Sequence, residues 1–199
     1  MHRHSRNEAP GRTLPLLVGF AAVECAAGCE NVPPYLERSY LRAGETGLLE
    51  PLSVKGDRGV GPFLGLAGTL GTLLEVERTQ ASAVEFEAKY LYNLGPGAEF
   101  DGIGFGADAA WRRFWGMERR VRPNVGFGAG YLRMSIDGRL GRYDPLGPEL
   151  FADGGVDYMI TSRFGIGARV RGLVRYELAD DNHGLVPGAE FTLHSVWRF

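Results

Sequence analysis

The side chains of this 199-residue chain that could support chemistry are charged residues placed at every second position. Glu85, Glu87 and Lys89 follow this spacing in one segment, and several arginines follow it in another. Residues two apart share one face of a β-strand, and an unpaired buried charge costs several kcal/mol. We therefore expect acids and bases to pair across the inside of a closed sheet. The expected lumen charge network comprises Glu75, Glu77, Glu85, Glu87, Lys89, Arg112, Arg169, Arg171, Arg175 and Arg198.

Catalytic chemistry has less support in the sequence. A serine nucleophile needs a histidine base beside it, and an acid that orients the histidine. His194 and Ser195 are adjacent, so they point to opposite faces of a strand. His183 follows Asp180 and Asp181, but no serine is close to it in sequence. We predict that the chain is not an enzyme, with no catalytic site, metal site or required cofactor. A lipid-A-modifying barrel enzyme is kept as an alternative.

Composition excludes several classes of protein. The 22 basic and 24 acidic residues nearly balance, whereas a nucleic-acid binder concentrates basic charge on one face. The 30 glycines and 11 prolines disfavour long helices. No run of about 18 apolar residues is present, so we expect no membrane-spanning helix. These properties favour a chain built from strands that does not bind nucleic acid.

The N-terminal segment is predicted to be a secretory signal peptide. Arginines precede a short apolar segment, Leu14 to Val23, and small residues follow it. Both cysteines, Cys25 and Cys29, belong to this region, so we expect no disulfide framework. The residues before Cys29 are similar to a bacterial lipoprotein processing box, which would make Cys29 a lipid acceptor. Cleavage by an ordinary signal peptidase is the alternative. The predicted organisation is a signal peptide (1–28), a short leader (29–38) and a β-barrel domain (39–199).

From residue 39 onward, apolar and polar residues alternate with the period of a β-strand. The clearest segment, 163–178, alternates over about 16 residues, whereas most strands have about 5–6. Near residue 132 the phase reverses, which predicts a β-bulge or the exit of the strand from a bilayer. The pattern indicates about eight strands, or ten if residues 60–80 split at Thr69–Thr72. The segments are 39–50, 63–77, 84–94, 102–112, 125–137, 150–160, 163–178 and 189–199.

Strands can cross a bilayer only when the sheet closes on itself, since lipid offers no hydrogen bonds to bare backbone. We predict an all-β fold: a closed antiparallel up-and-down transmembrane β-barrel of about eight strands, with a lumen that side chains fill. The outer faces would be apolar. A soluble sandwich or lipocalin-like barrel, with its apolar faces inside, is the alternative. Aromatic residues expected to form an interfacial belt at the end with short links are Trp111, Trp115, Tyr158, Trp197 and Phe199.

The predicted links between strands alternate in length. Short turns at one end and long loops at the other are typical of outer-membrane barrels, with the short turns in the periplasm. An even number of strands then places both ends of the barrel in the periplasm as well. The short links are near 79–82 and 161–163, 116–123 is intermediate, and the long links are near 54–60, 95–100, 138–149 and 179–188.

Three segments resemble strands of the outer-membrane protein A type barrel family: Val84–Tyr92, Arg122–Tyr131 and Leu150–Thr161. The last segment, Phe191–Phe199, ends in an aromatic residue and is similar to the terminal signal read by the bacterial barrel-assembly machinery. The resemblance covers roughly residues 38–199. It implies the fold, a bacterial outer-membrane location, and both outer-membrane lipid and the assembly machinery as partners. It implies no ligand and no catalytic residue.

A structural or surface-interaction role follows as the leading hypothesis. The lumen would be plugged by salt bridges, and the long outer loops 138–149 and 179–188 would contact an extracellular partner. A small porin or transporter of small apolar compounds is the alternative function. It would need an open or lateral path, which a lumen full of paired charges argues against.

Overall fold

The computed structural model describes residues 38–54, 57–92, 100–138, 141–179 and 182–199. The predicted signal peptide, Cys29 and all of the leader except Arg38 lie outside these residues. No helix long and apolar enough to cross a membrane occurs within them. The strands are β1 (Ser39–Val54), β2 (Asp57–Val76), β3 (Gln80–Tyr92), β4 (Phe100–Trp115), β5 (Val121–Gly138), β6 (Gly141–Tyr143), β7 (Leu146–Met159), β8 (Phe164–Ala179) and β9 (Asn182–Arg198).

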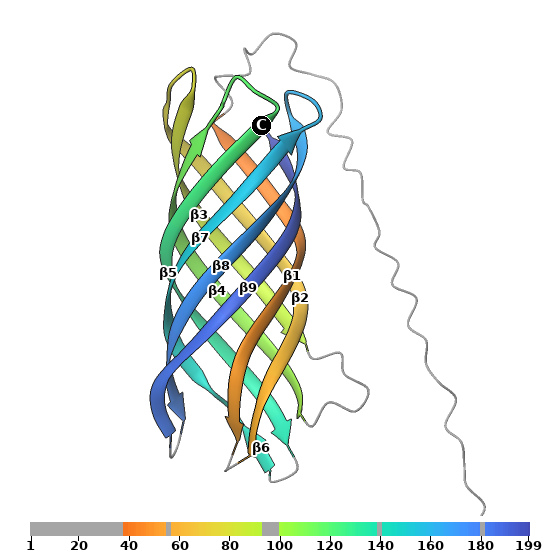
Figure 1. Cartoon of the computed structure of the whole chain (residues 1–199), viewed down its shortest axis with the longest axis vertical. Helices are drawn as coiled ribbons and strands as arrows, with labels where there is room; N and C mark the ends of the chain where they lie inside the picture. The colour runs from red at the N-terminus through yellow and green to blue at the C-terminus, as the bar shows by residue number, and fades with distance from the viewer. Residues whose placement is uncertain (1–37, 55–56, 93–99, 139–140, 180–181) are drawn as a thin grey trace, which may run out of the picture. The chain divides into compact units, whose positions relative to one another are not determined.

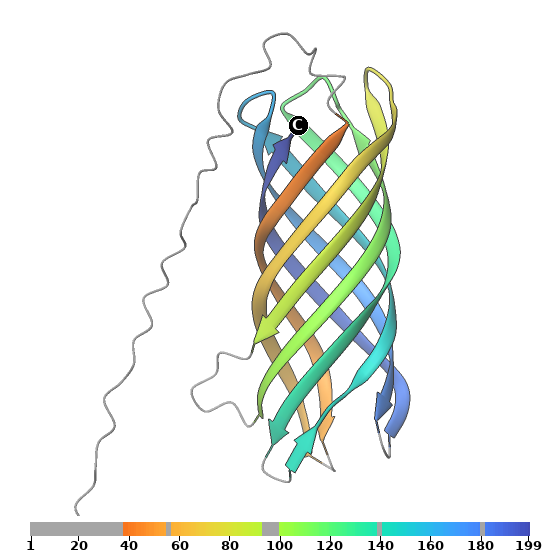
Figure 2. The ribbon, with the colours of Figure 1, turned by 180° about the vertical axis from the view of Figure 1, so that it is seen from behind.

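The sheet closes on itself as an antiparallel barrel (Figures 1 and 2). Successive long strands pair in chain order, and β1 pairs with β9 to close the ring. The three-residue β6 lies beside the end of β5, so the wall itself has eight strands. β2 runs unbroken, with one register shift against β3, between Leu73 and Glu75. The prediction of an eight-stranded barrel is confirmed, and the ten-stranded alternative is wrong.

The two ends of the barrel differ. At one end, turns of a few residues join β2 to β3, β4 to β5 and β7 to β8. We call this the short-turn end. Both ends of the barrel domain lie there, since the backbones of Ser39 and Phe199 exchange hydrogen bonds of 3.3 and 3.0 Å. The C-terminus marks this end at the top of Figure 1.

At the opposite end, the hairpins stay paired further than the sequence predicted. β1 and β2 pair up to Val54 and Asp57, and β8 and β9 pair up to Ala179 and Asn182. The prediction of long loops near 54–60 and 179–188 is therefore wrong. Glycine and proline suggested loops, but hydrogen bonds to the neighbouring strand override local turn preference in these hairpins. The link at 138–149 contains β6 and the start of β7, and most of the link at 95–100 lies outside the described residues.

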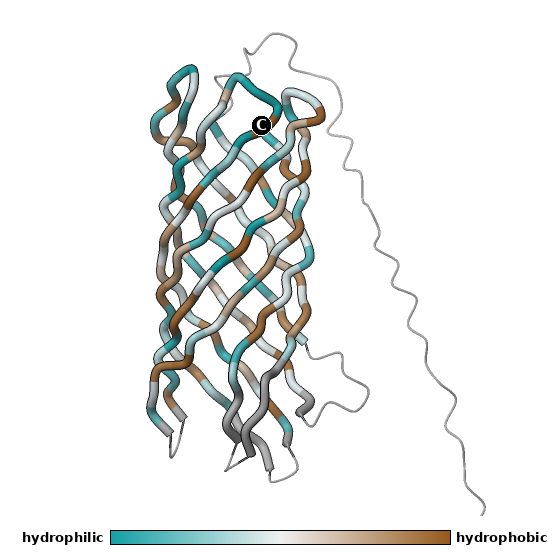
Figure 3. Tube along the Cα trace, viewed as in Figure 1, coloured by the Kyte–Doolittle hydropathy of each residue, from teal (hydrophilic) through white to brown (hydrophobic). Residues whose placement is uncertain are grey.

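The outer wall of the barrel is apolar. Apolar and polar residues alternate along the long strands (Figure 3). Leu66, Phe86 and Leu150 are examples of side chains that are more than half exposed on this wall. Charged side chains of these strands such as Glu87 and Asp153 are buried inside. This arrangement is that of a membrane barrel, and it excludes the lipocalin-like alternative, which places its apolar faces inside.

Aromatic side chains lie on the outer wall close to the short-turn end, as the sequence predicted. Trp115, Tyr158 and Trp197 are exposed there. Phe199 is exposed as well, and Trp111 is half-buried with its ring centroid 5.3 Å from that of Phe127. Amphipathic rings at this height are suited to the boundary between lipid and water.

Near residue 132 of β5 the outward-facing residues become polar and the inward-facing residues become apolar, while the strand pairing stays regular. Pairing with β4 and with β7 continues through Arg133 without a register shift, so the predicted β-bulge near residue 132 is wrong. Outside, Arg133 and Asp137 are exposed, which agrees with the alternative that the strand leaves the bilayer there. Inside, Leu132 and Ile136 are buried. The lumen itself therefore turns apolar at this height.

Candidate functional site: the charged network of the lumen

Strand alternation directs one face of every long strand into the barrel. On β3 this face carries Glu85, Glu87 and Lys89, and all three are buried. In the order of the sheet β8 lies opposite β3, and it presents three buried arginines. We define the lumen network as the buried residues Arg42, Glu50, Glu85, Glu87, Lys89, Asp108, Arg112, Glu149, Asp153, Asp157, Arg169, Arg171, Arg175, Glu190 and His194.

Glu85 connects three strands near the short-turn end. It accepts a hydrogen bond of 2.7 Å from Nε of Arg112 and a further one from Arg42. Arg112 also donates hydrogen bonds to both carboxylate oxygens of Asp153, at 2.6 and 3.0 Å. Arg42 donates a hydrogen bond of 2.8 Å to Asp157. Such two-point contacts between guanidinium and carboxylate are among the strongest charge-assisted hydrogen bonds in proteins. These contacts tie β1, β3, β4 and β7 together across the lumen.

Lys89 is the central cation in the middle of the lumen network. Its Nζ lies 2.7 Å from Glu149, 3.0 Å from Glu190 and 3.5 Å from Asp108. Arg171 contacts the same Asp108 at 2.5 Å. One ammonium group therefore contacts acids from three strands. Because the lysine and its acids are fully desolvated, loss of this cation would remove the ion pair of Glu149 and weaken those of Glu190 and Asp108, which arginines of β8 also contact.

Glu87 is held from β8 by two arginines. Arg169 contacts it at 2.5 Å and Arg171 at 2.9 Å, while the hydroxyl of Thr69 donates a hydrogen bond of 2.9 Å. The guanidinium carbon of Arg171 also lies 3.8 Å from the centre of the Phe151 ring. The flat faces and the edges of this guanidinium are thus both in contact, which lysine could not reproduce.

Glycines on the inner faces leave room for these long side chains, as the sequence suggested. A Cβ atom at Gly106 would lie 2.6 Å from Cε of Lys89. One at Gly130 would overlap the carboxylate of Asp108. The charged network therefore depends on the absence of side chains at defined positions of β4 and β5.

Toward the end opposite the short turns, the lumen is filled by apolar residues. We call this group the apolar plug: Leu48, Phe63, Leu91, Ala110, Leu132, Met134, Ile136, Phe151 and Leu173. One ion pair is enclosed beside it, between Arg175 and Glu50 at 2.9 Å. The same arginine donates a hydrogen bond of 3.5 Å to the sulfur of Met134. A smaller apolar cluster lies at the short-turn end: Tyr40, Leu73, Ala81, Ala83 and Phe114.

Two predicted members of the network lie outside it. The side chain of Glu75 is 76% exposed, and its nearest cation is Arg113 at 3.9 Å. Glu77 is exposed and accepts a hydrogen bond from Gln80. The register shift between Leu73 and Glu75, at the end of β2, breaks the alternation that placed these acids inside. This part of the prediction is wrong.

The other predicted residues point into the barrel. Glu85, Glu87, Lys89, Arg112, Arg169, Arg171 and Arg175 form the contacts described above, and Arg198 is buried at the short-turn end. The sequence prediction omitted Arg42 and Glu50 on β1, the acids of β4 and β7, and Glu190. Each of them shows the same period of two as the predicted residues. Arg42, between Leu41 and Ala43, could have been found from that signal alone.

Catalytic groups are not brought together among the described residues. His194 points inward, and its Nε2 lies 2.9 Å from Asp157, whereas the hydroxyl of Ser195 donates to the backbone oxygen of Ala43 at 3.0 Å. The two side chains are on opposite faces of β9, as their spacing implies. His183 is exposed. Within the described ranges, no group of three or more histidine, cysteine or acidic residues is placed to hold a metal ion.

Comparison with known proteins shows similarity at the level of the fold. No protein-family model and no curated protein sequence matches the chain. Among solved structures, Neisserial surface protein A has 16% identity and a TM-score of 0.59, covering 81% of this chain and 97% of that one. Ail, the attachment invasion locus protein of Yersinia pestis, has 14% identity and a TM-score of 0.54, with 82% and 99% covered. OprG of Pseudomonas aeruginosa has 13% identity and a TM-score of 0.52, with 81% and 96% covered. The chain therefore has the fold of the small outer-membrane β-barrels of the outer-membrane protein A type.

Proposed function

We propose that this chain is a closed barrel of the bacterial outer membrane with a structural or surface-interaction role. The observation that supports the proposal is the filling of the lumen. Ion pairs such as Lys89–Glu149 and Arg112–Asp153 join its walls, and the apolar plug fills it toward the far end. The interior of a barrel of about eight strands is narrow enough for side chains to fill it. The working surfaces of such a protein are its outside and its two ends.

The hairpins opposite the short turns are the proposed contact surface for an extracellular partner. In these hairpins the strands stay paired almost to the turn. The short strand β6 also pairs with the end of β5. A paired hairpin loses less conformational entropy on binding than an open loop does, which favours recognition. Outer-membrane lipid is the proposed partner of the apolar wall. The last strand, which ends at Phe199, is the proposed contact for the barrel-assembly machinery.

Two steps test this function. First, the full chain is produced in a bacterium, and the outer-membrane fraction is run unboiled and boiled in a detergent gel. A closed barrel resists the detergent unboiled and changes its mobility after boiling. Second, residues 139–143 are replaced by Asn-Gly, which removes β6. The proposal expects unchanged membrane insertion and heat-modifiability, with loss of attachment of the cells to a surface to which the native protein confers binding.

A chain found in the soluble periplasmic fraction would contradict the membrane role. A β6-deleted variant that keeps full attachment would remove this hairpin from the proposed contact surface. The matched control replaces Asn93–Glu99, in the link between β3 and β4, by a linker of equal length. That control preserves β6, so it separates the effect of the hairpin from that of altering any outer link.

A further inference from the structure

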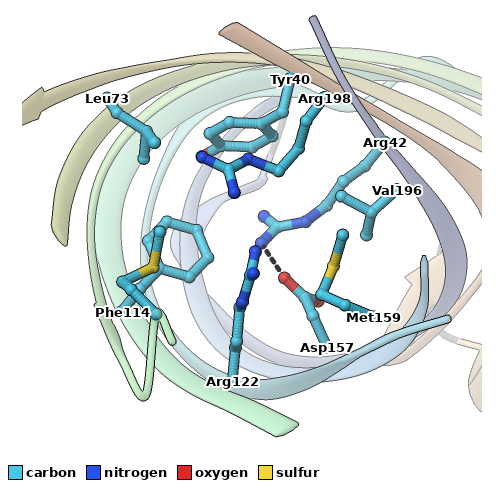
Figure 4. A pocket seen from close by; sticks show the side chains of 10 residues that line it. Tyr40, Arg42, Leu73, Phe114, Arg122, Asp157, Met159, Val196 and Arg198 are labelled. Carbon is cyan, nitrogen blue, oxygen red and sulfur yellow. Dashed lines mark hydrogen bonds and ion pairs between the residues drawn. The ribbon is translucent and has the colours of Figure 1, made fainter. Parts of the chain in front are cut away.

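Glu45 lies on the lipid-facing side of β1, where its surroundings differ from those of the charges inside the barrel. Arg42, on the inner side of the same strand, contacts both Glu85 and Asp157, and Figure 4 shows it beside Asp157. Glu45 forms no hydrogen bond or ion pair with any residue that the structure describes. Between the aromatic belt and the height of Arg133, no other Asp, Glu, Lys or Arg is exposed on the described outer wall. Glu45 is therefore an isolated carboxyl group in an apolar surface.

The register of the sheet places Glu45 near the middle of the bilayer. A row of paired residues winds once around the barrel, from Pro123 to Arg133, which is ten residues further along β5. Pro123 is two residues beyond Val121, which pairs with Tyr158 of the aromatic belt, and β5 leaves the bilayer at Arg133. Glu45 is the midpoint of this row, four strands from either end. Ten residues of a tilted strand rise about 25 Å, the height of the apolar band of a membrane barrel, so Glu45 is about 12 Å from either boundary.

The wall around Glu45 is uncharged and includes several small residues. Its neighbours across the strands are Leu66 on β2 and Leu193 on β9. The adjacent outward row, toward the short-turn end, consists of Gly68, Ala43 and Ser195. The hydroxyl of Ser195 donates its proton to the backbone oxygen of Ala43 at 3.0 Å, so it does not donate to Glu45. Small residues at this position allow another membrane-spanning surface to come close to the carboxyl group.

We propose that Glu45 binds its counterpart in a second copy of this chain, through two hydrogen bonds between protonated carboxyl groups. Each hydroxyl donates to the carbonyl oxygen of the other carboxyl, so neither copy keeps a charge or an unpaired polar group in the lipid. A charge is costly in hydrocarbon, and a carboxyl group without a counter-charge takes up a proton there instead. The two hydrogen bonds then provide what a single neutral carboxyl lacks in lipid, a donor and an acceptor.

The depth of Glu45 and the symmetry of protein pairs favour a second copy as the partner. Lipid chains form no hydrogen bonds, and only helices and closed barrels span the bilayer at this depth. A second copy brings the same carboxyl group to the same depth. Most homodimers have twofold symmetry and use the same surface on both subunits. With the twofold axis along the membrane normal and beside β1, each Glu45 meets the other at the axis. This surface is on the wall of the barrel, away from the hairpins proposed above as the extracellular contact surface.

The test is sedimentation equilibrium of the full barrel in detergent micelles matched in density to the solvent, over a range of ratios of protein to detergent. The proposal expects a reversible monomer–dimer equilibrium. Glu45→Leu should weaken the dimer by about tenfold, the amount expected for loss of the hydrogen bonding of one polar pair in a membrane. Glu45→Gln should stay within about threefold of the native protein, because two amides also exchange two hydrogen bonds. In a single barrel Glu45 has no partner, so Glu45→Leu should destabilise the pair without destabilising its subunits.

Two glycines offer a matched steric test of the same surface. A Cβ atom at Gly68 or at Gly172 would meet nothing within 4 Å, so leucine at either position should leave the barrel folded. Gly68→Leu adds bulk beside Glu45 and should weaken the dimer by at least about tenfold, whereas Gly172→Leu, on β8, should change it by less than about twofold. Heat-modifiability of each variant establishes that its barrel is folded.

The response to pH separates the paired carboxyl groups from contact between apolar walls. No acid or base on the described outer faces of β1, β2 and β9 lies beside Glu45. Raising the pH from neutral to alkaline should dissociate the native dimer, because two ionised carboxylates repel each other, but it should not dissociate the Glu45→Gln dimer. A native protein that is monomeric at every ratio would overturn the proposal. Native-like dimers of Glu45→Leu, or equal weakening by Gly68→Leu and Gly172→Leu, would overturn it as well.

Discussion

The lumen of this barrel is filled in two ways, and the two regions obey different rules. The lumen network uses buried ion pairs, in which each charge depends on a particular partner such as Lys89 on Glu149. The apolar plug uses packed side chains such as Leu132 and Met134, for which volume matters more than identity. Removing one partner of a buried ion pair leaves an uncompensated charge. An apolar core tolerates a substitution that keeps its volume. The lumen network therefore depends on the identity of its charged groups, and the apolar plug depends on the volume of its side chains.

The largest expected effect breaks the network at Arg171. This arginine contacts both Glu87 and Asp108, at 2.9 and 2.5 Å. Arg171→Leu should lower the free energy of unfolding by about 3–5 kcal/mol, because both acids lose a buried partner. The measurement is urea-induced unfolding in lipid vesicles, followed by tryptophan fluorescence. Arg133→Leu is the control, since Arg133 is exposed on the outer wall. Equal effects of the two substitutions would contradict the role of the network.

The apolar plug should respond to volume rather than to chemistry. Leu132 is fully buried in it. Leu132→Ala should lower the free energy of unfolding by about 2–5 kcal/mol, since a cavity remains. Leu132→Met keeps most of the volume and should cost less than about 1.5 kcal/mol. The same unfolding measurement applies. If the two variants lost equal stability, the distinction between the two regions would not hold.

Adding a single methyl group at an inward-facing glycine should lower the stability of the barrel. A Cβ atom at Gly130 would overlap the Asp108 carboxylate, whereas one at Gly172, which is exposed on the outer wall, would meet nothing within 4 Å. Gly130→Ala should therefore cost about 1–3 kcal/mol through overpacking, and Gly172→Ala should be close to neutral. Comparison of their urea midpoints tests this. A neutral Gly130→Ala would mean that the network shifts to make room.

The smallest expected effect concerns a carboxylate on the lipid-facing wall. Glu45 is exposed between Leu66 and Leu193, four residues beyond Leu41, which pairs with Trp197 of the aromatic belt. A charge at this height has a cost in lipid, smaller for acids than for bases. Glu45→Leu should raise the free energy of unfolding by about 1 kcal/mol. Glu118→Leu, in an exposed turn, is the control and should have no effect; a loss of stability for Glu45→Leu would point to a partner for this carboxylate.

The sequence was sufficient to predict the fold and one face of each strand. In β8, the spacing of Arg169, Arg171 and Arg175 places them on one side, and hydrophobic residues occupy the other. Closure of the barrel could then be inferred, because strands cross a bilayer only when the sheet closes and satisfies every backbone hydrogen bond. The long hairpins could not be predicted from the sequence. Their glycine and proline residues suggest loops, and only the pairing with the neighbouring strand shows that these segments are strands.

The pairing within the lumen could not be predicted, for two physical reasons. Alternation says which side a residue faces, but contacts such as Arg175 with Glu50 also depend on the stagger of strands far apart in the chain. The register shift near Glu75 moved two acids outside without any clear local signal. The apolar plug was missed because Leu132, Met134 and Ile136 resemble a lipid-facing run until the neighbouring strands are in place.

The central claim is that paired charges and the apolar plug close the lumen, and ion conductance tests it most directly. The purified barrel is inserted into planar lipid bilayers, and single-channel current is recorded over a range of voltages. The account predicts that the native protein, once a heat-modifiability assay has established that it is folded, carries no steady current. A stable, ohmic channel in the native protein would contradict the account, because ions would then pass where Lys89, Arg171 and their acids are placed.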